Sequence, residues 1–149
     1  MDINDVLAVV DSDAAGSLCL SKGGWEGWLQ CELWRYLTLG KDEVVERELA
    51  YPGSRDRCDL VISSSAAPPL WVEIKAFGIF REGDADRFLD SIGLDMMKLE
   101  FKPHGARGLA LVVVPTAIGD ALHAALQARK WFGFERTNSK YASVYHLTF

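Results

Sequence analysis

The chain has 149 residues, of which 49% are hydrophobic and 25% charged, so it is long enough for one domain with a real core. We therefore expect a single domain over residues 1–149. The 16 basic residues are outnumbered by 21 acids, and the formal net charge of −5 argues against a protein that coats nucleic acid by bulk electrostatics. Any nucleic-acid partner would have to meet a local basic patch.

The cysteines and the apolar runs restrict the protein further. Cys19, Cys31 and Cys58 form no Cys-x-x-Cys pair, which argues against a disulfide framework and against a zinc ribbon. The longest apolar run, Leu109 to Pro115, is far shorter than the ~20 residues of a membrane span, and no secretory signal opens the chain. We expect a cytoplasmic protein without a membrane partner.

The first half of the chain begins with a segment that the sequence leaves undecided. Residues 1–22 could start with a short helix or a strand. From Trp25 to Leu39, apolar residues recur at three- and four-residue steps, which predicts a helix that ends at Gly40. Within it, Glu26 and Glu32 both lie near apolar neighbours in projection. An acid there either pairs with another group or simply bonds a backbone atom.

Three strands are expected next. Val44 to Tyr51 alternates loosely and is followed by the turn signal Pro-Gly. The runs 55–62 and 70–75 are rich in Val, Ile and Trp and are separated by a segment of Ser, Ala and Pro, which predicts a β-hairpin.

The second half alternates helices and strands. Asp84 is a candidate N-cap for a helix that runs to about Glu100. Leu109 to Val114 reads as a strand buried on both faces, Gly119 to Trp131 as a helix, and Tyr141 to Phe149 as a closing strand at the sheet edge. This order predicts an α/β fold in which helices cover a mixed sheet.

The hairpin carries acids where a buried strand should be apolar. Successive side chains of a strand point to opposite faces, so Glu73 and Lys75 share one face while Val72 and Ile74 share the other. Asp59 opens the partner strand. Two carboxylates and an ammonium group can therefore converge, and such a site suits a divalent cation.

These residues resemble the PD-(D/E)XK nuclease superfamily, which includes restriction endonucleases and Holliday-junction resolvases. The likeness consists of Asp59, a gap of thirteen residues and then Glu73-Ile74-Lys75, with a helix before and a helix and buried strand after. It covers about Trp25 to Pro115. The chain departs from the pattern at Cys58, where the motif has proline.

The resemblance implies a restriction-endonuclease-like αβββαβ core and a metal-dependent site. Asp59 and Glu73 would hold Mg²⁺ or Mn²⁺, Ile74 would add its backbone carbonyl, and Lys75 would lie beside the attacking water. A helix glutamate commonly completes such a site; we expect Glu32 in this role, with Glu26 as the alternative.

Three functions fit these residues. The first is a nuclease that hydrolyses DNA, acting as a homodimer, on a DNA structure or with a partner protein. The second is a catalytically inactive module of the same fold, such as an immunity or anti-defence protein, and the third is a domain that binds a phosphate ligand. The same acids and lysine could also form only a salt-bridged strand end. Six basic residues could supply a phosphate-binding rim or be solvated surface: Arg55, Arg57, Arg81, Arg87, Lys98 and Lys102.

Overall fold

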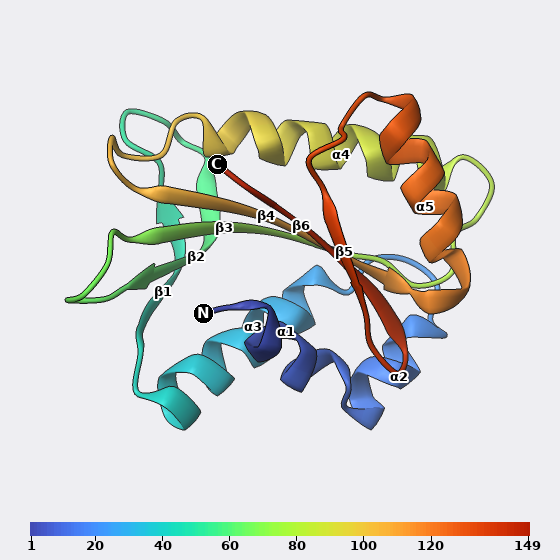
Figure 1. The fold of residues 1–149 in the computed structure, drawn as a ribbon, viewed down its shortest axis with the longest axis horizontal. Coiled ribbons are helices and arrows are strands. Elements are labelled where there is room, and N and C mark those ends of the chain that lie inside the picture. The colour runs from blue at the N-terminus through green and yellow to red at the C-terminus, as the bar shows by residue number, and fades with distance from the viewer.

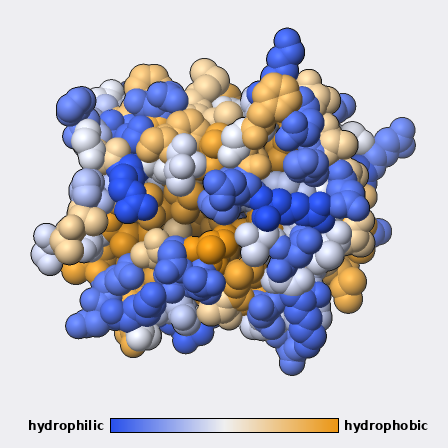
Figure 2. Space-filling model, in the orientation of Figure 1, coloured by the Kyte–Doolittle hydropathy of each residue, from blue (hydrophilic) through white to orange (hydrophobic).

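The sheet lies between two layers of helices in a computed structural model that describes residues 1–149 (Figure 1). Helices α1 (Ile3–Val10), α2 (Asp13–Cys19) and α3 (Glu26–Arg35) cover one face, and α4 (Asp84–Leu99) and α5 (Thr116–Ala128) cover the other. In the same view, hydrophobic surface gathers at the centre and to its left, between the two layers of helices, whereas hydrophilic residues cross the right of the middle (Figure 2). None of the helices is long and apolar enough to cross a bilayer.

The undecided segment at the start of the chain forms two short helices. Asp2 and Asp5 make a reciprocal capping box at the start of α1, and the hydroxyl of Ser12 caps α2. The predicted helix from Trp25 is confirmed as α3, which continues through a π-helical turn, η1 (Tyr36–Gly40).

The six strands form one mixed sheet in the order β1-β2-β3-β4-β6-β5. The expected strand and hairpin are confirmed as β1 (Val44–Ala50), β2 (Arg57–Ser63) and β3 (Leu70–Ala76), which pair antiparallel in series. Strand β4 (Arg107–Pro115) pairs parallel with β3, because α4 carries the chain back across the sheet.

Two predictions about element ends and one about position were wrong. The N-cap of α4 is Gly83, with φ of 77°, and Asp84 is already helical. Helix α5 begins at Thr116, directly after β4, and not at Gly119. Strand β6 (Ala142–Thr148) is not at the edge, because β5 (Glu135–Asn138) pairs with its outer side; that polar tetrapeptide carries no apolar alternation that would reveal a strand.

The sheet separates two hydrophobic cores, and β3 contributes to both. Leu70, Val72 and Ile74 point into the core under α1 to α3. Trp71 points into the core under α4 and α5. Because side chains alternate, Glu73 and Lys75 share the face of Trp71 and are directed toward α4.

Candidate functional site

The site begins where β2 and β3 stop pairing. Their ladder ends at the pair Leu60 and Val72, so the next residues of the two strands are free to separate. The Asp59 carboxylate enters this gap, and its Oδ2 accepts a hydrogen bond from the backbone N–H of Ile74 at 2.7 Å. The N–H and C=O of a strand residue point to the same side, so the carbonyl of Ile74 is directed toward the same gap.

A distortion in β1 accompanies this opening. Glu48 stands opposite Asp59 in the register and has φ of 55°, a left-handed conformation that is unfavourable for a residue with a side chain. The amide nitrogen of buried Gln30 on α3 donates to both Glu48 Oε1 at 3.0 Å and Asp59 Oδ1 at 3.2 Å. Arg47 in turn donates to Gln30 Oε1 at 2.7 Å. Gln30 thereby links α3 to the two residues that leave the ladder.

Glu73 lies deepest in the site and is only 1% exposed. The Tyr51 hydroxyl donates to its Oε1 at 2.7 Å, and Lys98 Nζ lies 2.7 Å from its Oε2. Both carboxylate oxygens are therefore satisfied by protein groups, one from the end of β1 and one from α4.

Asp95 on α4 connects the two lysines of the site. Its Oδ2 lies 2.8 Å from Lys75 Nζ, and its Oδ1 lies 2.8 Å from Lys98 Nζ. The Asp95 side chain is 6% exposed, whereas those of Lys75 and Lys98 are 19% and 26% exposed. The acids are thus sealed more completely than the ammonium groups.

Burial controls the protonation of these acids. It raises the pKa of Asp59 to about 6, against the opposing hydrogen bond from Ile74. It also raises the pKa of Glu73 to about 7, although Lys98 opposes the shift. Burial disfavours the charge of Lys75, but Asp95 more than compensates, so the pKa of Lys75 is raised and its amine stays protonated.

A cavity of about 420 Å³ on the side of α4 reaches Lys75 but not the carboxylates of Asp59 and Glu73. Lys75, Asp95 and Lys98 line it together with the apolar residues Leu94, Met97 and Phe101. A small anionic group can therefore approach the two lysines from solvent.

The structure brings together three of the four predicted catalytic side chains. Asp59, Glu73 and Lys75 lie at one place on the sheet, and the charges of Asp59 and Lys75 act on each other. Glu32 is not brought there: it forms a surface ion pair with Arg35 at 2.8 Å. Glu26 is closer to the site, since its charge contributes to the raised pKa of Lys75.

Sequence reasoning missed three residues of the site and gave a fourth a lesser place. Gln30, Tyr51 and Asp95 were not expected, and Lys98 was expected only as a possible rim cation. Gln30 follows the candidate acid Glu26 by one helical turn, and this spacing could have pointed to it. Tyr51 was seen only as the end of a strand. Trp25 and Trp71, each 4% exposed, are core residues.

The donor atoms fit a hard divalent cation in their chemistry. The carboxylate oxygens of Asp59 and Glu73 and the carbonyl of Ile74 are the ligand types that Mg²⁺ and Mn²⁺ favour. No group of three or more His, Cys, Asp or Glu side chains is arranged to hold a metal ion. A cation would thus be held by two side chains and one backbone oxygen, with water completing its shell.

Comparison of the chain with protein-family models, with curated proteins and with solved structures finds no match.

Proposed function

We propose that the protein is a metal-dependent nuclease with a restriction-endonuclease-like core, and that it hydrolyses phosphodiester bonds of DNA. The observation that carries the proposal is the placement of Asp59, Glu73 and Lys75 beside the gap between β2 and β3, close enough for their charges to act on one another, with Lys75 also lining a cavity open to solvent. Acids with raised pKa values and specific charge partners occur at functional sites more often than elsewhere.

Each residue of the site would have a separate role in such a reaction. Asp59 and Glu73, with the carbonyl of Ile74, would hold Mg²⁺ or Mn²⁺, which makes a bound water more acidic and stabilises charge on the phosphate. Lys75 would orient the attacking water and contact a phosphate oxygen. Because Asp95 keeps Lys75 protonated, its part is to donate hydrogen bonds and positive charge and not to accept a proton.

One observation favours a second function. Glu73 is already bonded by Tyr51 and Lys98, and Lys75 is already paired with Asp95, so the buried charges compensate one another without any ligand. Such a closed network suits a catalytically inactive module of the same architecture that binds or regulates a partner protein. The net charge of −5 agrees with this alternative.

Cleavage of DNA distinguishes the two functions. Purified protein is incubated with supercoiled plasmid, with branched DNA and with single-stranded DNA in Mg²⁺, in Mn²⁺ and in EDTA. The nuclease predicts cutting that needs the cation and disappears in Asp59→Ala, while the control Glu32→Ala cuts normally. Absence of cutting under every condition, with both variants folded, selects the inactive module.

A further inference from the structure

We infer that the substrate of this site is single-stranded nucleic acid, with unstacked bases, and not duplex. The inference rests on the proposed function, because it assumes that the phosphate to be cut enters the cavity above Lys75 and Lys98. It is based on a difference between two parts of that cavity: its floor, with Lys75 and Lys98, is charged, and its rim, with Leu94, Met97 and Phe101, is apolar.

The floor is polar and can take one phosphate. Lys75 and Lys98 both reach the cavity, and each keeps part of its side chain exposed. Asp95 lies between them, and Asp56 also lines the cavity. With two ammonium groups among several acids, the floor offers little positive charge beyond what one phosphate needs.

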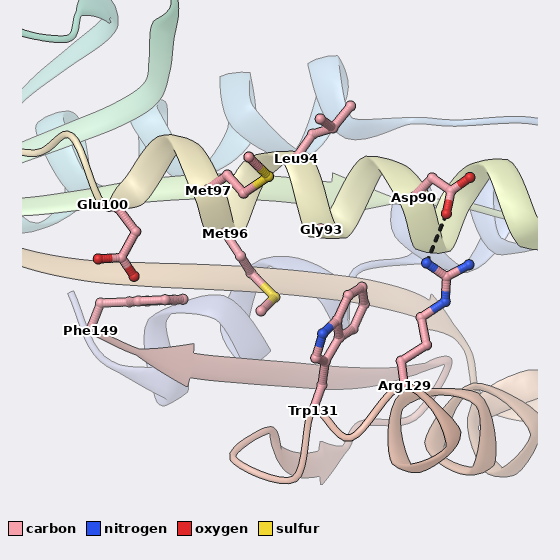
Figure 3. A pocket seen from close by; sticks show the side chains of 9 residues that line it. All are labelled: Asp90, Gly93, Leu94, Met96, Met97, Glu100, Arg129, Trp131 and Phe149. Atoms are coloured by element: carbon pink, nitrogen blue, oxygen red, sulfur yellow. Dashed lines mark hydrogen bonds and ion pairs between the residues drawn. The ribbon is translucent and has the colours of Figure 1, made fainter.

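The rim is apolar. Leu94, Met97 and Phe101 are 61%, 63% and 62% exposed, although each is a large hydrophobic residue. Leu94 and Met97 also border a second hollow of about 540 Å³ on the other flank of α4. There the rings of Trp131 and Phe149 lie on either side of Met96 (Figure 3). Half-buried aromatic side chains thus line the hollow that adjoins the cavity.

A duplex does not suit this surface. Duplex binding depends on many phosphate contacts from lysine and arginine. The arginines that border α4 are already paired, Arg87 with Asp84 at 2.9 Å and Arg129 with Asp90 at 2.7 Å. In a duplex the bases are turned inward, so the apolar rim would face sugar and phosphate and would remove their hydration without compensation.

Single-stranded nucleic acid matches the cavity and its apolar rim. Its bases are free to stack on exposed aromatic rings, a contact that tolerates any sequence. Phe101 stands at the cavity that contains both lysines, so a base can rest on its ring while the adjoining phosphate enters. Trp131 and Phe149 line the adjoining hollow but are half-buried, and the Arg129 guanidinium lies over the Trp131 ring, so Phe101 is the principal stacking surface.

The test compares binding of a single strand and a duplex. The full-length wild-type protein is titrated in EDTA, where a metal-dependent nuclease cannot cut, against a labelled oligothymidylate of about 16 nucleotides and against its duplex, with fluorescence anisotropy as the readout. We expect at least about tenfold tighter binding of the single strand. Phe101→Ala should weaken that binding about tenfold, whereas the control Phe132→Ala, equally exposed but outside both hollows, should not.

The outcomes separate this inference from the proposed function. Preferred binding or cutting of duplex by the wild-type protein overturns the inference and leaves the nuclease intact. Single-strand binding that depends on Phe101, without cutting in any cation, keeps the inference and removes the nuclease. If no oligonucleotide binds, or if Phe101→Ala changes only the sedimentation of the protein, the inference is wrong; in the latter case the rim is a protein interface.

Discussion

Two lysines serve the acids of this site in different ways. Lys98 contacts Glu73 at 2.7 Å and also Asp95, so it compensates the most deeply buried carboxylate. Lys75 contacts Asp95 alone and lines the cavity. Lys75 is therefore free to exchange its partner for a phosphate or a water, whereas removal of Lys98 would leave Glu73 with an uncompensated charge.

Replacement of Lys75 by methionine tests this division. We expect Lys75→Met to lower DNA cleavage at least about 100-fold, the usual range for loss of a positioned group in the reaction. Folding should be spared, because Asp95 keeps its contact with Lys98 and methionine is similar to lysine in length and volume. Initial rates and a thermal melt measure both effects, with exposed Lys22→Met as the matched control. Full activity in Lys75→Met would remove this residue from the mechanism.

The raised pKa values of the acids also predict how stability changes with pH. In the folded protein the pKa of Asp59 is about 6 and that of Glu73 about 7, above their ordinary values of 3.8 and 4.5. Between pH ~4 and ~7 the folded state therefore binds more protons than the unfolded state, so these groups make the free energy of unfolding fall as pH rises. Each contributes a slope of at most about 1.4 kcal/mol per pH unit.

Urea denaturation across this range measures the slope. In Asp59→Asn we expect a shallower decline than in the wild-type protein, whatever its stability at a single pH. An equal slope in the two proteins would mean that Asp59 titrates as an ordinary exposed acid.

At the scale of elements, the site depends on the local failure of the β1–β2–β3 ladder. Glu48 on β1 and Asp59 on β2 face each other, and the left-handed conformation of Glu48 occurs at the very position where Asp59 turns toward Ile74. Backbone strain of this kind persists where surrounding contacts enforce it, often at functional sites. The contacts here come from Gln30 and Arg57, which bond the side chain and the carbonyl of Glu48.

Two substitutions at Glu48 isolate that strain. Glu48→Ala and Glu48→Gly lose the same side-chain contacts and differ only in the Cβ atom. Because φ is 55°, we expect the glycine variant to be more stable than the alanine variant by about 1 kcal/mol. Chemical denaturation measures the difference. Equal stabilities, or a more stable alanine variant, would show that the backbone at this position is unstrained.

At the scale of the whole molecule, the alternation of apolar and charged side chains in β3 was the main signal from which the site could be predicted. The pattern of Val72, Glu73, Ile74 and Lys75 was sufficient to place the acid and the lysine on one face, and the order of elements was sufficient for a mixed sheet between helices. The partners from other elements were not foreseeable in this way. Asp95 and Lys98 come from α4, and their approach to β3 depends on how the helix packs and not on local periodicity.

Glu32 also shows that helical periodicity alone does not predict which groups a side chain contacts. Its helical projection placed it near apolar neighbours, but Arg35, one turn further, pairs with it at the surface. The side chain of α3 that reaches Asp59 is Gln30, which carries no charge to attract notice. Strand β5 was missed for a related reason, since its stability comes from pairing with β6 and not from an apolar pattern.

Titration of Mn²⁺ by calorimetry tests the central claim most directly, namely that Asp59 and Glu73 share one cation. We predict one site per chain in the wild-type protein, weakened at least about tenfold in Asp59→Ala, as expected for loss of a ligand. Glu32→Ala should bind as the wild-type protein does. Absence of Mn²⁺ binding, or binding that survives unchanged in Asp59→Ala, would contradict the account.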